Sequence, residues 1–408
     1  MSVIECFLSH ASHDADAGWI DPLGAEQRLR GIDVWRDQGK LQGGQANWIE
    51  IGKAISRCTL MAVFITPASI QRDALWNELR LADERWRLDP DFPIFPIRIG
   101  VSRVELDALC EKNGLHALSE HWDCELFLAP ETPPLDPSWS ADLARRIVDS
   151  AVETRVRSIG TRPLAIAIRT RAENGLQVPD LDIDWSSFFV VEPDASTWDR
   201  LLVALKDSTD AIKQRTRQPR IGVELISRLG VAFALGWAIP RTSPRQLDLL
   251  YPPPRNVWAS DVLAADDGLT DFEESADGEG EPQLGALLVS ISRDARDMYG
   301  RSPSLRRPGR ILAVDRPDTP LAAESAAWAA ERIGITVRDW CDKRGISEVH
   351  IFGAMPTGLA VFIGRQLNAT ADVKVFHDVN GVYREACRLT VGTKGAGAVP
   401  HAQEGPGE

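Results

Sequence analysis

Apolar positions in the first 155 residues alternate between runs typical of strands and spacings typical of helices. Leu60 to Ile65 is an uninterrupted apolar run, as in a strand covered on both faces. Leu75, Leu79, Ala82 and Trp86 fall on one side of a helix. Further strands are expected at 3–8, 34–35 and 92–99, and further helices at 21–29, 48–56 and 138–156. This alternation predicts an α/β fold with a parallel sheet between two layers of helices.

The rest of the chain looks like two copies of a second α/β unit. Residues 220–236 align with residues 348–364 at an offset of 128, which places Gly230 over Gly358 and Gly236 over Gly364. We expect strands at 164–168, 285–291, 310–314, 349–352 and 373–376, and helices at 320–344 and 358–367. A duplicated unit of this kind presents two clefts at the carboxyl ends of its strands, facing each other. We expect Gly236 and Gly364, two turns into their helices, to serve packing.

Two stretches contain few apolar side chains that a core could bury. Residues 261–281 are acidic and weakly apolar, so we expect a solvated connector between the copies. The tail at 391–408 is expected to be disordered. The pattern breaks near residues 158–162. The predicted domains are therefore 1–157 and 158–390, the second with halves at about 160–260 and 284–390.

Composition narrows the possible functions. A chain of 408 residues exceeds one typical core, and its net charge of -13 argues against binding long DNA or RNA, although a small nucleotide stays possible. No run of 18 apolar residues and no signal-peptide pattern is present, so we expect a cytoplasmic protein with no membrane partner. Six scattered cysteines predict reduced thiols, and we expect no metal site.

Polar residues follow each expected strand of the first domain. Ser9 and His10 follow the first strand, Trp35 and Asp37 lie at the end of the second, and Thr66 ends the third. Together with the glycine-containing stretch 39–44, Trp48 and the run Trp76-Asn77-Glu78-Leu79, these landmarks resemble a TIR domain over about residues 1–155. The resemblance implies a flavodoxin-like parallel sheet and, as in part of the family, cleavage of NAD+. The segment 37–48 corresponds to the loop through which TIR domains often contact one another.

The resemblance assigns the catalytic role to Glu78. NAD-cleaving members carry a glutamate about twelve residues after the Ser or Thr that ends the third strand, and Thr66 to Glu78 is twelve. One departure is Ala74, where the family usually has a tryptophan. Glu84 is the alternative, but it lies about 240° further round the helix, so the two cannot share a cleft. The implied NAD+-binding residues are Ser9, His10, Trp35, Asp37 and Trp48. NAD+ is then substrate, and no cofactor is expected.

The most specific motif of the second half is residues 349–368, VHIFGAMPTGLAVFIGRQLN. With the strand at 373–376 and the duplication, it resembles the SAVED domain over about residues 160–390. SAVED domains are fused pairs of CARF-like, Rossmann-like units that sense cyclic oligonucleotides in the antiviral system called CBASS. The ligand-binding residues expected at strand ends and helix starts are Arg169, Thr170, Ser227, Arg228, Leu229, Ser292, Arg293, Ala354, Met355, Pro356, Thr357 and Gly358.

A TIR domain joined to a SAVED domain resembles an effector type that answers cyclic tri-adenylate by forming filaments and cleaving NAD+ to nicotinamide and ADP-ribose products. This reading implies a cyclic oligonucleotide as activator and self-association on binding. The alternative is a TIR scaffold without catalysis, recruited by the sensor, and Ala74 is its best support. A third reading, a housekeeping nucleotide hydrolase, has neither a P-loop nor metal-ligand spacing behind it.

Overall fold

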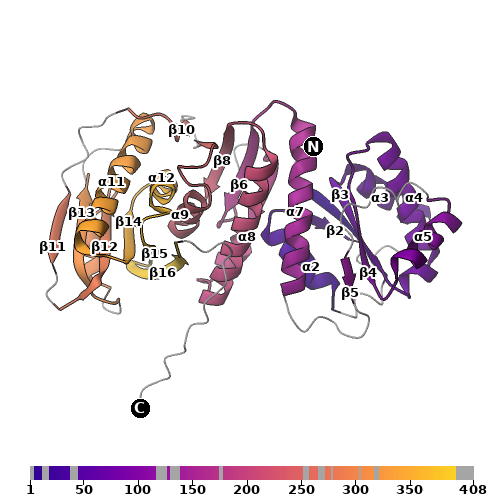
Figure 1. Ribbon diagram of the computed structural model, residues 1–408, viewed down its shortest axis with the longest axis horizontal. Coiled ribbons are helices and arrows are strands. Elements are labelled where there is room, and N and C mark those ends of the chain that lie inside the picture. The colour runs from indigo at the N-terminus through magenta and orange to yellow at the C-terminus, as the bar shows by residue number, and fades with distance from the viewer. Residues whose placement is uncertain are drawn as a thin grey trace, which may run out of the picture. The chain divides into compact units, whose positions relative to one another are not determined.

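The structure is a computed structural model. It describes residues 4–11, 18–36, 45–115, 126–128, 138–173, 178–250, 257–264, 272–276, 279–302, 305–316 and 321–391. The chain divides into two compact units (Figure 1). The first contains Met1–Ser187 and Ala204–Ile226, and the second contains Phe188–Val203 and Ser227–Glu408. The domain boundaries at 157 and 390 stay a prediction.

The first unit is built on a parallel sheet with the strand order β2-β1-β3-β4-β5, which is the flavodoxin-like order. All its pairings are parallel. The strands are β1 (Glu5–Ser9), β2 (Asp33–Trp35), β3 (Leu60–Ile65), β4 (Ile94–Ile99) and β5 (Leu126–Leu128). Every residue of β3 is buried, as its apolar run predicts for a strand covered on both faces. The expected α/β class with a parallel N-terminal sheet is confirmed.

Helices cover both faces of this sheet. The helices and the short 3-10 turn η1 are α2 (Ile20–Leu29), α3 (Gln45–Arg57), η1 (Ser69–Gln71), α4 (Asp73–Leu88), α5 (Arg103–Lys112) and α7 (Ser138–Ile159). In Figure 1, α2 and α7 lie on one side of the sheet and α3 and α4 on the other. The core on the second side contains side chains of β1, β3, α3 and α4. Glu78, on α4, therefore belongs to a helix held firmly against the sheet.

The first of the two repeats begins in the same unit. Strand β6 (Leu164–Arg169) pairs in parallel with β7 (Leu181–Asp184) and β8 (Arg220–Ile226). The 3-10 turn η2 (Ser186–Phe189) and helix α8 (Ala195–Arg215) connect β7 to β8. The sequence pattern did not single out α8.

A buried ion pair joins α2 to α8 within this unit. Arg30 is fully buried, and its Nη2 and Nε lie 2.7 and 3.0 Å from Oδ2 of Asp207. Arg30 also donates to Glu26, and its backbone oxygen accepts from Ser208 at 3.1 Å. The indole of Trp185 donates to the oxygen of Leu29 at 2.9 Å. Within the first unit, the N-terminal fold therefore packs against residues 204–215 of α8.

The second unit holds a six-stranded sheet with the order β11-β13-β12-β14-β15-β16. Its strands are β11 (Glu273–Ala276), β12 (Glu281–Ser290), β13 (Pro308–Asp315), β14 (Glu348–Ala354), β15 (Asp372–Val379) and β16 (Val382–Leu389). Strands β9 (Gln246–Leu250) and β10 (Val257–Ala259) pair with each other in antiparallel fashion. The helices and the short 3-10 turn η3 are α9 (Leu229–Ala238), α10 (Ala295–Gly300), η3 (Ala323–Ser325), α11 (Ala326–Arg344) and α12 (Thr357–Leu367).

The two repeats follow the same sequence of pairings, so the duplication is confirmed. β6 pairs in parallel with β7 and β8, and β12 pairs in parallel with β13 and β14. Antiparallel pairs then follow in each, β9 with β10 and β15 with β16. Gly230 and Gly358 are each the second residue of their helix.

Helices α9 and α12 cross at glycines. A Cβ on Gly236 would lie 1.9 Å from the oxygen of Val361, and one on Gly364 would lie 2.3 Å from the oxygen of Phe233. Such distances are impossible for real atoms, so only glycine permits this approach. The expected packing role of both residues is confirmed. Gly230 is also a packing residue, because its Cβ would lie 2.8 Å from that of Ala386.

The structure corrects two expectations about secondary structure. Part of the acidic stretch 261–281 is no solvated connector: Glu273–Ala276 forms the edge strand β11, and Glu274 accepts from Arg344, Arg310 and Trp340. Paired cations offset the charge that made this stretch look unstructured. The helix expected at 320–344 begins at Ala326, after the 3-10 turn η3. The tail beyond residue 391 lies outside the described residues.

Candidate functional site

Ser9 and Glu78 meet at the carboxyl edge of the N-terminal sheet. Ser9 is the last residue of β1, lies opposite Val63 of β3 and is buried. Its hydroxyl donates a short hydrogen bond to Oε2 of Glu78, which lies in the second turn of α4. In a sheet of this order, the carboxyl edge between β1 and β3 is where ligands bind. The two residues are 69 positions apart, so only the fold brings them together.

The turn after β3 sets the position of α4. Thr66 and Ser69 bond each other reciprocally, with the amide of Thr66 donating to the Ser69 hydroxyl at 2.8 Å and the amide of Ser69 donating to the Thr66 hydroxyl at 3.0 Å. The Ser69 hydroxyl also contacts the oxygen of Phe64 at 3.2 Å. Both side chains are buried, so this turn is fixed and directs the start of α4 back over the sheet edge.

The space beside Glu78 is small. It is lined by Ser9, His10, Ala11, Ser69, Arg72, Ala74, Leu75 and Glu78, and its volume is about 20 Å³. Ligand pockets usually measure roughly 300 Å³ or more. The space that these described residues line is therefore smaller than a dinucleotide. Nδ1 of His10 lies 3.1 Å from the oxygen of Ala11.

The tryptophans near the first three strands pack against other parts of the protein. Trp35 stacks on Phe7 with ring centres 4.9 Å apart, and Trp48 packs half-buried against the core. Trp76 is buried, and its indole donates to the oxygen of Ile70 at 3.0 Å, so it cannot replace the tryptophan missing at Ala74. Asp37 and the glycines at 39, 43 and 44 lie outside the described residues.

Glu84 takes no part in this space. It is exposed on α4, whereas Glu78 is half-buried and lines the space beside Ser9. The separation round the helix agrees with the angle expected from the sequence. The structure thus places one glutamate of α4 at the sheet edge.

In the second unit, the starts of α9 and α12 meet. A Cβ on Gly353, in β14, would lie 3.0 Å from Cδ2 of Leu229 and 2.3 Å from Cε of Met355. Leu229 is the first residue of α9, and Met355 lies two residues before α12. The two helix starts that the duplication relates therefore converge, and helix N-termini favour anions. Pro356 caps α12 and Thr357 opens it, while Gly358 is buried.

The other expected ligand residues lie at strand ends in their own units. The amide of Ser292 donates to the oxygen of Ala354 at 2.8 Å, which joins the loops after β12 and β14. Arg293 is exposed and lies 3.8 Å from Asp378. In the first unit, the guanidinium of Arg169 lies 3.0 Å from Asp182, and the amide of buried Thr170 donates to the oxygen of Ile226 at 2.9 Å.

Two residues that the sequence reasoning missed lie next to Arg228. Glu192, in the loop between η2 and α8, lies 3.5 Å from the Arg228 guanidinium and 2.7 Å from Nε2 of His377 on β15. Burial lowers the pKa of His377, with the Glu192 charge opposing that shift, so a neutral ring is favoured. These three residues are remote in sequence, and no motif marks them as a group.

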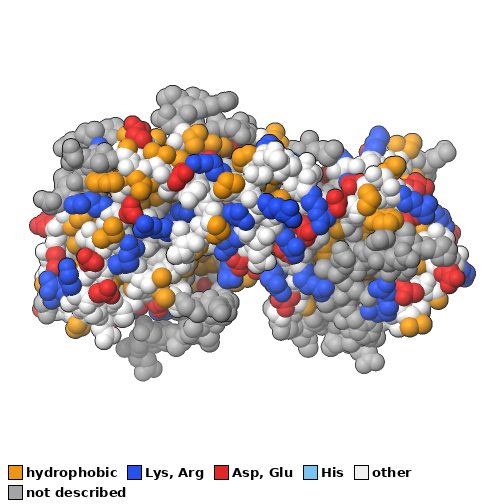
Figure 2. Space-filling model, turned by 45° about the horizontal axis from the view of Figure 1, so that its top comes forward, with side chains coloured by type: hydrophobic (Ala, Val, Ile, Leu, Met, Phe, Trp, Pro, Cys, Tyr) orange, Lys and Arg blue, Asp and Glu red, His pale blue; other side chains and the backbone are white. Residues whose placement is uncertain are grey.

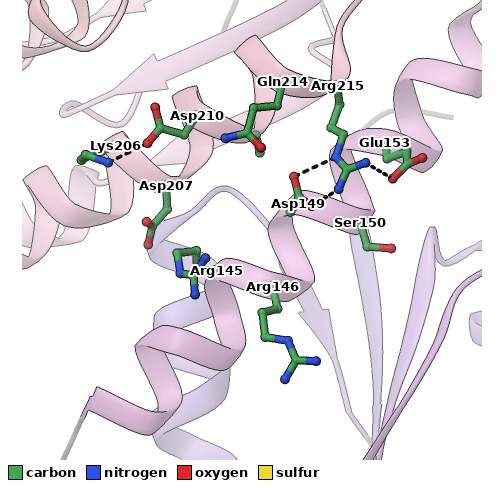
Figure 3. Close-up of a pocket in the computed structure, with 11 residues that line it drawn as sticks. Arg145, Arg146, Asp149, Ser150, Glu153, Lys206, Asp207, Asp210, Gln214 and Arg215 are labelled. Carbon is green, nitrogen blue, oxygen red and sulfur yellow. Dashed lines mark hydrogen bonds and ion pairs between the residues drawn. The ribbon is translucent and has the colours of Figure 1, made fainter. Parts of the chain in front are cut away.

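A polar cleft of about 490 Å³ lies between α7 and α8 in the first unit (Figure 3). Arg215 pairs with Asp149 and Glu153, and Lys206 lies 2.6 Å from Asp210. Cations and carboxylates are thus interspersed along the cleft. The face drawn in Figure 2 has the same character, with basic side chains scattered among acidic ones. We therefore do not propose an anion-binding site in this cleft.

The five described cysteines are free and buried. Burial raises the pKa of Cys6 and of Cys341 to about 12, which makes them inert thiols. Cys124 lies outside the described residues. Among the residues that the structure describes, no three His, Cys, Asp or Glu side chains are grouped to hold a metal ion. None of the described helices combines the length and apolar character needed to span a membrane.

Comparisons with known proteins agree with the motifs. Residues 6–126 match the family model described as TIR domain. Residues 205–389 match the model described as SMODS-associated and fused to various effectors sensor domain, or SAVED. A search of the curated proteins found no match.

Solved structures resemble the chain at low identity. The Cap4 SAVED/CARF-domain containing receptor of Acinetobacter baumannii, solved with the cyclic trinucleotide 3'3'3'-cAAA, is 15% identical with a TM-score of 0.49, over 82% of this chain and 90% of that one. The Cap4 receptor of Moraxella osloensis is 13% identical with a TM-score of 0.46, over 92% and 98%. TIR domains of the activated Roq1 resistosome are 16% identical with a TM-score of 0.29, over 36% and 99%.

The two family matches fall where the motifs lie: the Ser9–Glu78 edge is inside the first, and the helix starts at Leu229 and Thr357 are inside the second. The chain thus carries a TIR domain at its N-terminus and a SAVED sensor domain in its C-terminal half.

Proposed function

We propose that the chain is a ligand-gated NAD+ glycohydrolase, an effector of the CBASS antiviral system. A cyclic oligonucleotide, in the first place cyclic tri-adenylate, binds the SAVED domain. Bound copies then associate head to tail, and the TIR domain cleaves NAD+ to nicotinamide and ADP-ribose products. An association of this kind that does not close on itself forms a filament.

The observation that carries the catalytic half is the Ser9–Glu78 contact at the carboxyl edge of the TIR sheet. Breaking the bond between nicotinamide and ribose builds positive charge on the ribose. A carboxylate held in a fixed orientation stabilises that charge or binds the ribose hydroxyls. Nicotinamide leaves as a neutral molecule, so the reaction needs little acid catalysis. The Ser9 hydroxyl supplies the orientation.

The volume beside Glu78 supports gating. The described residues enclose about 20 Å³ there, too little for NAD+. Activity then requires a rearrangement of the site, and assembly of neighbouring TIR domains through the segment 37–48 would supply it. A single copy is accordingly expected to be inactive.

The sensor half rests on the SAVED match and on the converging starts of α9 and α12. Two related helix N-termini, with Arg228 beside one of them, suit a ligand that repeats phosphate groups around a ring. The proposed ligand contacts from the second unit are Ser227, Arg228, Leu229, Ser292, Arg293 and residues 354–358. Arg169 and Thr170, in the first unit, stay a prediction from the sequence.

The test is NAD+ consumption by the purified protein with a panel of cyclic di-, tri- and tetranucleotides, while particle size is followed by light scattering. Activity and large assemblies appearing with one ligand, cyclic tri-adenylate in our expectation, would support the proposal. Assembly without NAD+ loss would instead favour the non-catalytic scaffold. Equal activity without any ligand would contradict the sensor role.

A further inference from the structure

The loop of residues 190–194 brings a carboxylate against a proposed ligand residue. Glu192 lies 3.5 Å from the guanidinium of Arg228, which caps α9, and 2.7 Å from Nε2 of His377. The side chain of Glu192 is only 15% exposed and that of His377 only 4%. Arg228 also lies over the ring of Phe189, 5.8 Å from its centre. The ion pair is thus set in a half-buried, partly aromatic environment.

This cluster is poorly satisfied. Oε1 of Glu192 lies 2.7 Å from Nε2 of His377, but Oε2 of Glu192, Nδ1 of His377 and the hydroxyl of Ser227 are buried without a well-aligned hydrogen bond among the described residues. The separation from Arg228 exceeds the roughly 2.7–2.9 Å of a strong charge-assisted bond. A buried carboxylate with one oxygen left without an aligned donor is unfavourable, and such a group calls for an explanation. An anion that pairs more closely with Arg228 can therefore displace the Glu192 carboxylate.

The tip of the loop is not anchored in the core. Val190 and Val191, just before Glu192, are 83% and 77% exposed and contribute nothing to the core. The other end of the loop is fixed, because Asp194 accepts from the amide of Thr197 at 2.8 Å and starts α8. Withdrawing Glu192 therefore need not disturb the core.

We propose that Glu192 is an internal latch that occupies Arg228 in the free protein and is displaced by a phosphate of the activating ligand. The inference rests on the proposed function, since it assumes that Arg228 binds the ligand. Each phosphodiester of a cyclic oligonucleotide carries one negative charge. A phosphate that reaches Arg228 is repelled by Glu192 unless that carboxylate moves. The latch then sets how much ligand is needed for activation.

A different role would reverse the sign of the effect. Glu192 could stay in place and accept a hydrogen bond from an exocyclic amine of a ligand base, in which case its removal would weaken binding. Its position against Arg228 favours the latch, because the carboxylate faces a cation and not an open space.

The experiment measures the affinity of the full chain for cyclic tri-adenylate by titration calorimetry. We expect E192Q to tighten binding roughly threefold to tenfold and to lower the ligand concentration for half-maximal NAD+ cleavage by a similar factor. Glu192→Met, uncharged and of similar length, should act in the same direction. Asp199→Asn, which removes an exposed carboxylate of α8, is the charge-matched control and should leave affinity unchanged.

A double-mutant cycle with R228A separates the latch from a general charge effect. The gain from E192Q should vanish when Arg228 is absent. An equal gain in both backgrounds, or weaker binding by E192Q with an unchanged melting temperature, would overturn the latch. Failure of the unaltered protein to bind cyclic tri-adenylate or any other member of the panel would instead contradict the proposed function, and the latch with it.

Discussion

At the scale of single residues, the proposed TIR site is built on one hydroxyl and one carboxylate. Ser9 ends a buried strand and cannot shift, so its hydroxyl holds Glu78 in one orientation at the sheet edge. Glu84, on the same helix, is exposed and has no such support. Position on α4 therefore separates a candidate catalytic carboxylate from an ordinary surface glutamate.

Glu78→Gln should lower the rate of ligand-activated NAD+ cleavage by about 100-fold or more, because the neutral amide no longer stabilises the charge that develops on the ribose. The check is kcat in the presence of saturating activator, with activator affinity measured alongside and expected to be unchanged. Glu84→Gln is the control, and it should keep kcat within about twofold. Loss of activity in the Glu84 variant alone would move the catalytic role there.

The surroundings of Glu348 predict that the folded protein loses stability at acid pH. A hydrogen bond from His350 at 2.6 Å, with Lys374 and Arg388 nearby, lowers the pKa of Glu348 to about 2. A carboxyl group with a depressed pKa stabilises the fold above its unfolded pKa of about 4.5 and loses that contribution as pH falls towards 2. Glu348→Gln should therefore destabilise the protein by on the order of 2 kcal/mol at pH 7.

The difference in stability between the unaltered protein and the Glu348→Gln variant should shrink as pH is lowered from 6 to 3. Thermal unfolding across that range measures it. A difference that stays constant with pH would mean that the side chain acts through packing and not through its charge.

At the scale of elements, the crossing of α9 and α12 places the two repeats' helix starts together. Gly236 and Gly364 let the backbones touch, and Leu229 and Met355 then meet beside Gly353. The duplicated sequence produces a pair of related helices, and the glycines set how close they come. We therefore expect a substitution at either crossing glycine to shift the two helix starts at the proposed ligand site.

Gly236→Ala should destabilise the protein by roughly 2 kcal/mol or more, since the new methyl group overlaps the oxygen of Val361. Gly52→Ala is the matched control: Gly52 also lies inside a helix, but a Cβ there meets nothing within 4 Å. That variant should be neutral or stabilising by about 0.5–1 kcal/mol. Chemical denaturation compares the two, and equal effects would contradict the close crossing.

At the scale of the molecule, the TIR fold is bound to the start of the sensor by a buried junction. Arg30, which caps the C-terminus of α2, pairs with Asp207 of α8, and Gly31, with φ of 82°, fits against Leu181 and Ile183 of β7. Burial raises the pKa of Asp207, and Arg30 opposes that shift. Residues 181–183 and Asp207, which belong to the first sensor repeat, are therefore packed against the TIR fold within the first unit.

Asp207→Asn should destabilise the first unit by roughly 1–3 kcal/mol, because the buried Arg30 guanidinium then keeps only Glu26 as a counter-charge. Asp210→Asn, on the same helix, is the control. Its pairs with Lys206 and Lys213 are partly exposed, so its effect should stay below about 1 kcal/mol. Calorimetric unfolding measures both, and a small effect at Asp207 would mean that the junction is loosely held.

Most residues of the proposed TIR site could be predicted from local sequence, whereas the proposed latch could not. Ser9, Thr66 and Glu78 sit at strand ends and a helix start, which apolar runs and spacing locate. Glu192 and His377 are 185 positions apart and carry no motif. Likewise, the acidic composition around Glu274 concealed an edge strand, because its cationic partners, Arg310 and Arg344, lie far along the chain.

The sequence alone determined the α/β class, the duplication and the domain families, since these depend on hydrophobic period and on motifs within short segments. The tertiary structure decided which side chains meet: Ser9 with Glu78, Arg30 with Asp207, and Glu192 with Arg228. Such contacts depend on strand order and helix crossing. These follow from packing of the whole chain and leave no local pattern at the residues concerned.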